Sequence, residues 1–190
     1  MNEKRKLKLF VVLLGGRPDG VTIEQHNVLF GIAGELEDLY GAIKRFWPAV
    51  RKIHIDAYIC VEQVGDYDVV ICEKSEVPNL TDLETEKKLF FVNLGFYREE
   101  EFGERHMVIL DVASSEDEVK TTLKNHFKLT NDVTKSQIHI DDCHMLYDDL
   151  EVEILNDRNL KPEEFVVCLK KVRDDSFLYQ KVMVGYWELP

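Results

Sequence analysis

The chain of 190 residues contains two copies of a histidine–carboxylate pattern, and these are its strongest candidates for chemistry. Within each pattern, a histidine and an acidic residue are separated by one position. Residues two apart on a β-strand point to the same face, so the members of each pair can act together. The pairs of the first copy are Glu24 with His26 and His54 with Asp56, and those of the second copy are Glu104 with His106 and His139 with Asp141. Each half of the chain is therefore predicted to place two imidazoles and two carboxylates on sheet faces that meet.

Loop residues of the first copy extend this pattern toward a ligand site. Gly15 and Gly16 end an apolar run and allow a ligand to approach the bare backbone, while Arg17 and His26 offer hydrogen bonds to an anion. Loops on a rigid scaffold commonly carry binding residues. The sequence thus predicts a ligand-binding site in the first copy, with the members Gly15, Gly16, Arg17, Glu24, His26, His54 and Asp56.

The second copy lacks part of this site. Phe96 stands where the first copy has Gly16, and its loop contains Glu99, Glu100 and Glu101. An aromatic ring is expected to crowd the backbone there, and the acidic run is expected to repel an anion. Ligand binding is therefore predicted for the first copy only.

Three interpretations of the matched patterns stay open. The groups can form a hydrogen-bonded network that joins a hairpin loop to the third strand, because buried polar groups need partners. They can bind a small, anionic ligand or a protein partner, which makes the chain a non-enzymatic binding module; this is the preferred function. Alternatively, they can hold a divalent metal, or act as acid and base, in a small enzyme. No catalytic residue, metal ligand or cofactor is assigned, since the chain has no zinc-ligand spacing, P-loop, G-x-G-x-x-G or G-x-S-x-G motif.

The elements that must position these residues also occur twice, which indicates an internal duplication. The apolar run of residues 8–16 returns at residues 88–96, with the same spacing to Glu-x-His. Apolar residues at three- and four-residue steps predict one helix in each copy, over residues 36–47 and 115–127. Each copy is predicted to be a ββαββ unit of antiparallel sheet with one helix, which gives an α+β fold. The predicted strands are residues 9–14, 26–32, 53–56 and 67–72 in the first unit, and 89–94, 106–112, 138–141 and 150–155 in the second.

The domain boundaries follow from these elements. The first unit covers residues 1–73, residues 74–87 form a linker, and the second unit covers residues 88–155. Residues 156–190 are predicted to form a terminal β-hairpin, because the two hairpin strands of the repeat recur there at a constant offset. This half repeat has lost the glycine and the histidine, and it is expected to cap the last exposed edge of one compact body.

Charge and cysteine content limit the partners and the compartment. The chain has 24 Lys and Arg against 36 Asp and Glu, a net charge of −12, which argues against binding of duplex nucleic acid. The four cysteines form no C-x-x-C pair and are expected to be free thiols in a reducing compartment. No apolar run reaches membrane-spanning length, and the run that follows Lys6 recurs inside the chain, so it is not interpreted as a signal peptide. A cytoplasmic protein without a nucleic-acid or membrane partner is expected, and its strand edges predict a homodimer.

Several short motifs of the first copy resemble the motifs of a known protein family. They are Leu13-Leu14-Gly15-Gly16-Arg17, Glu24-Gln25-His26, Phe30-Gly31-Ile32, Phe46-Trp47-Pro48 and His54-Ile55-Asp56-Ala57. Together they resemble an uncharacterised bacterial family that is known only as a domain of unknown function and that occurs in one or two copies per chain. The resemblance covers residues 8–73 closely and residues 88–155 weakly, where Phe96, Arg105 and Asp142 replace Gly16, Gln25 and Ala57. It implies a duplicated α+β unit and no particular activity.

Overall fold

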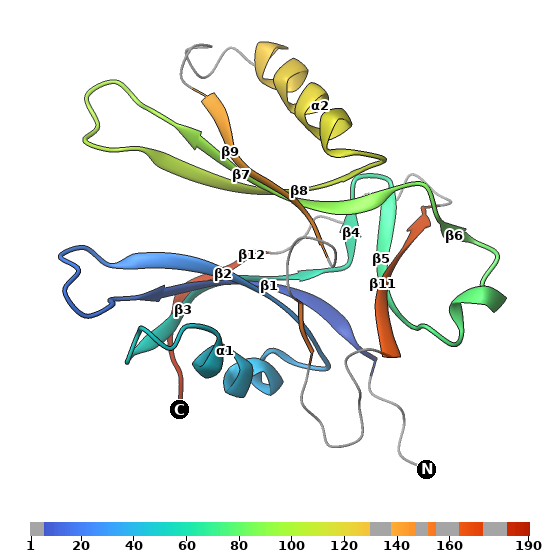
Figure 1. Cartoon of the computed structure of the whole chain (residues 1–190), viewed down its shortest axis with the longest axis horizontal. Coiled ribbons are helices and arrows are strands. Elements are labelled where there is room, and N and C mark those ends of the chain that lie inside the picture. Colours follow the sequence, from blue (N-terminus) through green and yellow to red (C-terminus); the bar gives the residue numbers. More distant parts are fainter. Residues whose placement is uncertain (1–5, 130–137, 147–151, 155–163, 173–181) are drawn as a thin grey trace. The chain divides into compact units, whose positions relative to one another are not determined.

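The computed structural model of the chain describes residues 6–129, 138–146, 152–154, 164–172 and 182–190 (Figure 1). The described part is α+β: its sheets are mostly antiparallel, and it contains two α-helices. The chain divides into two compact units. The first joins Met1–Leu83 to Val152–Pro190, and the second is Glu84–Glu151. No helix of the described residues is long and apolar enough to cross a membrane.

The first unit is built on a five-stranded sheet whose central strand is the apolar run of the first copy. The strands are β1 (Lys8–Gly16), β2 (Gln25–Ala33), β3 (Ile53–Val61), β10 (Val152–Ile154) and β12 (Val182–Glu188), in the order β10-β2-β1-β3-β12. β1 pairs antiparallel with β2 and β3, and β10 lies parallel to β2. A central strand is buried on both faces, which explains why β1 has a continuous apolar sequence instead of an alternating one.

One face of this sheet packs against a short helical segment. The segment consists of η1 (Leu36–Leu39) and α1 (Tyr40–Phe46). Leu39 and Ile43 are fully buried in one cluster with Val12 and Leu14 of β1. Successive residues of a strand point to opposite faces, so Gly15 faces away from the helix.

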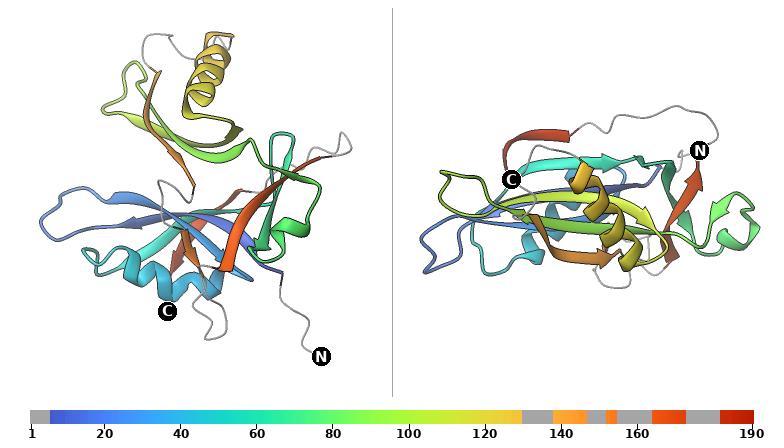
Figure 2. Two further views of the ribbon diagram at one scale, coloured as in Figure 1. Left: turned by 45° about the vertical axis from the view of Figure 1, so that its right-hand side comes forward. Right: turned by 90° about the horizontal axis from the view of Figure 1, so that it is seen from above.

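A smaller sheet contains the next two strands after β3, together with two later strands. Its members are β4 (Gln63–Val64), β5 (Tyr67–Glu73), β11 (Phe165–Lys171) and β6 (Leu83–Glu84), in the order β4-β5-β11-β6, with η2 (Val77–Asn79) between β5 and β6 in the sequence. Gly65 turns the chain between β4 and β5 with a φ of 54°, a conformation that favours glycine. β11 lies beside β5 (Figure 2). Cys72 of β5 and Cys168 of β11 are buried free thiols, and Cys60 and Cys143 are half-buried free thiols.

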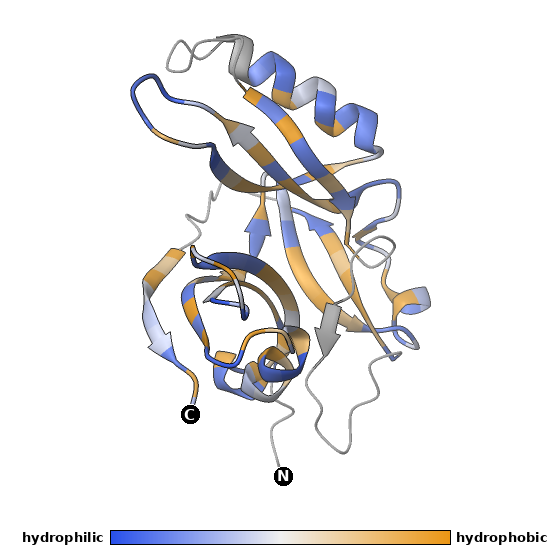
Figure 3. Cartoon of the chain, turned by 60° about the vertical axis from the view of Figure 1, so that its left-hand side comes forward, coloured by the Kyte–Doolittle hydropathy of each residue, from blue (hydrophilic) through white to orange (hydrophobic). Residues whose placement is uncertain are grey.

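The second unit repeats the first three strands and the helix. Its elements are β7 (Lys88–Phe96), β8 (Arg105–Ala113), β9 (Ile138–Met145) and α2 (Glu116–Leu129), and the antiparallel strands have the order β8-β7-β9. Val119 and Leu123 of α2 are buried in one cluster with residues of β7, whereas much of its remaining surface is hydrophilic (Figure 3). The Ser115 hydroxyl accepts a hydrogen bond of 3.2 Å from the Glu118 N–H, so Ser115 caps the start of this helix.

The fourth strand predicted for each unit does not join the sheet of that unit, and this part of the predicted ββαββ topology is wrong. β5 pairs with β4 and β11 in the smaller sheet, and β10 pairs with β2 of the first unit. Sequence periodicity identifies a strand but not its partner. Here β2 has a free edge on the side away from β1, and the unpaired backbone groups of that edge bind β10.

The predicted terminal hairpin is also wrong. β11 lies between β5 and β6, whereas β12 pairs with β3, so the two strands belong to different sheets. Their likeness to the hairpin strands lies in their apolar sequences, and an apolar run does not specify the partner of a strand. β12 instead covers the outer edge of β3, next to His54.

Candidate functional site

The strand register of the first unit places one histidine on each side of a single glycine. Gly15 of β1 lies opposite His26 of β2 and opposite His54 of β3. Directly opposed residues of antiparallel strands share a face of the sheet, here the face away from α1. Since glycine has no side chain, the two imidazoles can approach each other above its backbone. Glu24, two residues before His26, reaches the same place.

A β-bulge brings the second carboxylate to this place. The pairing of β1 with β3 shifts between Leu13 and Leu14, which lie opposite Ala57 and Ile55. Asp56 is thus the extra residue of β3. Bulges redirect side chains and are common next to functional sites. This one leaves the Asp56 carboxylate in contact with both imidazoles.

Four side chains form one network over Gly15. His54 Nε2 lies 3.3 Å from Glu24 Oε1 and 3.2 Å from Asp56 Oδ1, and His26 Nε2 lies 3.1 Å from Asp56 Oδ2. Despite that short distance, Asp56 Oδ2 is buried and accepts no well-oriented hydrogen bond from the described residues. A single N–H of His54 also cannot fully satisfy two carboxylates. The network therefore has more acceptors than donors.

The second unit builds the same network. Gly95 lies opposite His106 and His139, and Asp141 is the extra residue where the pairing of β7 with β9 shifts. His139 Nε2 lies 2.8 Å from Glu104 Oε1 and 2.9 Å from Asp141 Oδ1, and His106 Nδ1 lies 3.2 Å from Asp141 Oδ2. One nitrogen or oxygen atom from each of Glu104, His139 and Asp141 lies within 4.8 Å of the other two.

Glycine is required at the centre of both networks. A Cβ atom added to Gly15 would lie closer than 3.0 Å to His54 Nε2 and Asp56 Oδ2. One added to Gly95 would lie equally close to the matching groups of the second unit. Any other residue at these two positions would displace the polar side chains.

Two predicted site residues lie outside the network. Gly16 is on the opposite face of β1, where an added Cβ would meet Val50. Arg17 is exposed in the β1–β2 loop and forms no hydrogen bond or ion pair with the network among the described residues. Phe96 has the position of Gly16 and also faces away from the network of its unit. The prediction that its ring crowds that site is therefore wrong. The physical reason is the alternation of side chains along a strand.

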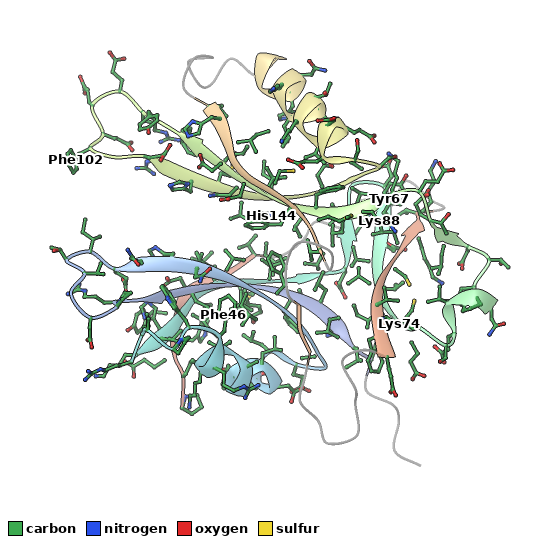
Figure 4. The ribbon with its side chains drawn as sticks, in the orientation of Figure 1. Phe46, Tyr67, Lys74, Lys88, Phe102 and His144 are labelled. Carbon is green, nitrogen blue, oxygen red and sulfur yellow. The ribbon has the colours of Figure 1, made fainter. Side chains whose placement is uncertain are left out.

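The remaining two histidines lie outside both networks. His144 is on β9 (Figure 4), where its Nε2 is 3.7 Å from Asp142 Oδ1. His126 is exposed on α2. The six histidines of the chain thus divide into four in the networks and two elsewhere.

The two networks differ in how far they are covered. The side chain of His54 is 7% exposed, against 47% for His139. Tyr186 of β12 covers His54, with the two ring centroids 4.2 Å apart. An irregularity in the pairing of β12 with β3, between Val184 and Trp187, places Tyr186 there. No described strand lies along the corresponding outer edge of β9.

Tyr97 is the aromatic neighbour in the second unit. Its ring stacks against that of His139 with the centroids 6.1 Å apart. Its hydroxyl donates a hydrogen bond to Glu104, and this bond, together with the negative charge of that carboxylate, raises the pKa of Tyr97 above its ordinary value. Sequence reasoning missed both tyrosines. Tyr97 directly follows the repeated run of residues 88–96 and could have been noticed, whereas Tyr186 depends on a strand pairing that has no local signal.

Each network is a mixed nitrogen and oxygen donor set with excess negative charge. With neutral imidazoles it carries two negative charges. The separations between His54 or His139 Nε2 and the nearest carboxylate oxygens run from 2.8 to 3.3 Å. Ligand atoms of a tetrahedral site are roughly 3.4 Å apart when each is about 2.1 Å from the metal. Small side-chain movements would therefore make room for a cation.

Comparisons with known proteins agree with this architecture. Residues 21–71 match the model of a family described as Domain of Unknown Function (DUF1543). No curated protein matches the chain. The crystal structure of the protein Il1583 from Idiomarina loihiensis has a similar fold, with 24% sequence identity, a TM-score of 0.63, and coverage of 97% of this chain and 99% of that chain. The resemblance to a domain of unknown function is confirmed over residues 21–71, which match the uncharacterised family DUF1543 and include all four polar members of the first network.

Proposed function

We propose that the chain is a binding module for divalent transition-metal cations, with one ion at the network of each unit. The ligands would be Glu24, His26, His54 and Asp56 in the first unit, and Glu104, His106, His139 and Asp141 in the second. The observation that carries this proposal is the convergence of Glu104, His139 and Asp141, whose donor atoms lie within 4.8 Å of one another. Imidazole nitrogen together with carboxylate oxygen suits zinc, iron or manganese better than magnesium or calcium.

A purely structural hydrogen-bond network accounts less well for these contacts. Buried polar atoms are nearly always hydrogen-bonded, so the unsatisfied Asp56 Oδ2 calls for a partner such as an ion. The carboxylates of Glu24 and Asp56 both approach the same nitrogen of His54. Two carboxylates side by side repel each other, and a divalent cation between them would neutralise both.

The likeness of the two networks supports an internal duplication of a ββαβ unit. Both units have the same strand order around β1 or β7, and both set a glycine opposite two histidines. Both also have a bulge at the aspartate that contacts those histidines. Bulges are kept within families because they serve a local purpose. The second unit is therefore inferred to be a copy that retained the network.

The test is a titration of metal-free protein with Zn²⁺, measured by isothermal titration calorimetry. Two sites are expected in the parent chain. The double substitution Glu24→Gln with Asp56→Asn should leave only the second site, and Glu104→Gln with Asp141→Asn should leave only the first. Glu62→Gln, which removes an exposed carboxylate at the end of β3, is the matched control and should keep both.

The titration can also contradict the proposal. If the parent chain and the variant with all four substitutions bind Zn²⁺ equally, the ions are held elsewhere. If neither binds Zn²⁺, Mn²⁺ or Fe²⁺, the networks are structural. Circular dichroism of each variant separates loss of a site from loss of the fold.

A further inference from the structure

We propose that the first unit has a second binding site, a basic cavity next to His54 that takes the oxyanion group of a small organic molecule. The group is a phosphate or a carboxylate. This site is distinct from the cation network and does not depend on a bound metal.

The cavity lies at the start of β3, between that strand, the segment before it and the C-terminal part of β12. Its volume is about 490 Å³. Pockets for small molecules are typically of about 300–1,000 Å³, so the space exceeds that of an inorganic ion. Val50, Ile53 and Leu189 supply apolar wall, which suits the carbon skeleton of a ligand.

The charged residues of the wall are mostly basic. Lys44, Arg51 and Lys52 line the cavity, against a single acidic side chain, Glu188. The chain as a whole has a net charge of −12, so a group of three cations around one hollow is contrary to its general composition. Arginine binds phosphate and carboxylate through two parallel hydrogen bonds, and lysine adds a compact positive charge. The recognised chemistry is therefore that of an oxyanion.

The existing partners of these cations are easily exchanged. Arg51 Nη2 lies 3.0 Å from Asp19 Oδ2, but both side chains are more than three-quarters exposed. Ion pairs at such exposure contribute little to stability, so a ligand can replace Asp19. Lys44 donates a hydrogen bond to a main-chain oxygen of Pro190.

His54 connects the cavity to the cation network. It lines the cavity, while its Nε2 contacts Glu24 and Asp56. Tyr186 lines the same cavity and stacks on the His54 ring. An anion bound by Lys44, Arg51 and Lys52 would thus lie near the network without competing for the atoms that would bind a cation. β12 provides this wall, and no described strand of the second unit takes the corresponding position.

The test uses the full chain, freed of metal with a chelator, and inorganic phosphate or acetate as the probe at constant ionic strength. Amide resonances from residues 44–54 and 186–190 should shift on addition of phosphate, acetate or both, and the responding probe identifies the oxyanion. The substitution of Arg51→Ala with Lys52→Ala should weaken binding roughly tenfold or more, because hydrogen bonds to charged groups are lost. Lys124→Ala, an exposed lysine of α2, is the control and should bind as the parent does.

Three results would overturn this inference. They are no response to either probe, an equal response to chloride, and equal weakening by Lys124→Ala. The variant Glu24→Gln with Asp56→Asn should still bind the probe, and at least as tightly as the parent, because it removes two negative charges next to His54. Because that variant lacks two proposed metal ligands, failure of the metal proposal and failure of the cavity proposal give different results.

Discussion

The ring centroids of Tyr186 and His54 lie 4.2 Å apart, and Tyr186 shields His54 from solvent. This contact joins β12 to β3, two strands that are far apart in the sequence. His139, the counterpart of His54, is 47% exposed. The chain therefore holds the same four side-chain types in two environments, and the second network is an internal control for the first.

Substitution of the covered histidine, His54, and of its half-exposed counterpart, His139, should have unequal effects on stability. His54→Ala is expected to lower the free energy of unfolding by about 1–3 kcal/mol, because it removes a buried imidazole that contacts Asp56 and Tyr186. His139→Ala should cost less than about 1 kcal/mol, since its contacts are half exposed. Urea unfolding measures both. His26→Ala and His106→Ala are matched controls with side chains 52% and 51% exposed, and these two should have equal effects. Equal losses from His54→Ala and His139→Ala would contradict the role of β12.

Adjacent glycines should separate the network from the packing beneath it. Gly15→Ala and Gly16→Ala both add a Cβ that meets other atoms closer than 3.0 Å. Each is expected to destabilise the fold by about 1–3 kcal/mol through overpacking. Only Gly15→Ala should displace the polar side chains and abolish Zn²⁺ binding at the first unit, as measured by calorimetry. If Gly16→Ala removes that binding as well, the two faces of β1 are not independent.

The titration of Tyr97 should report its contact with Glu104. Ionisation of Tyr97 loses the hydrogen bond to Glu104 and sets two negative charges together, which is why the pKa is raised. Glu104→Gln removes the charge and should lower the pKa toward the ordinary value. Absorbance at the tyrosinate band, recorded against pH, measures the change, and Tyr97→Phe identifies the contribution of this residue. An unchanged titration in Glu104→Gln would show that the contact is not formed in solution.

Cys168 should resist alkylation in the folded chain. Burial, followed by a hydrogen bond with Cys72, raises the pKa of Cys168 to about 12. The thiolate is the nucleophile, and at pH 8 a thiol with that pKa is ionised in only about one molecule in ten thousand. Iodoacetamide at pH 8, with mass spectrometry of the peptides, should modify Cys168 slowly in native protein and quickly in urea. Similar rates in the two conditions would mean that β11 does not bury this residue.

The edge of β12 is the expected surface for a homodimer. β12 is the outermost described strand on its side of the five-stranded sheet. Its residues Val182 and Val184 are 51% and 77% exposed. Unpaired edges with exposed apolar residues pair readily with a second copy. Light scattering at micromolar concentration should give the mass of a dimer, and Val184→Lys should give a monomer. Val108→Lys, on the edge strand β8 of the second unit, should leave the dimer intact. Dissociation by the Val108 substitution alone would place the interface elsewhere.

The sequence by itself determined the local elements and identified the four histidines and four carboxylates of the two networks. Two-residue spacing on strands put Glu24 with His26 and His54 with Asp56, and apolar periodicity predicted the helices. These features are local, because side-chain direction in a strand and the apolar face of a helix follow from the backbone period alone. For the same reason, the recurrence of the pattern with Glu104 and His106 was visible without a structure.

The tertiary structure decided which elements pair and which side chains meet. Only strand register shows that Gly15 lies between two histidines, and that Gly16 and Arg17 do not belong to the network. Likewise, the pairing of β10 with β2, and of β12 with β3, brings late parts of the chain onto the first sheet. A free strand edge accepts any compatible strand, so no spacing in the sequence specifies such partners. The cover that Tyr186 gives to His54 is therefore a property of the assembled sheet.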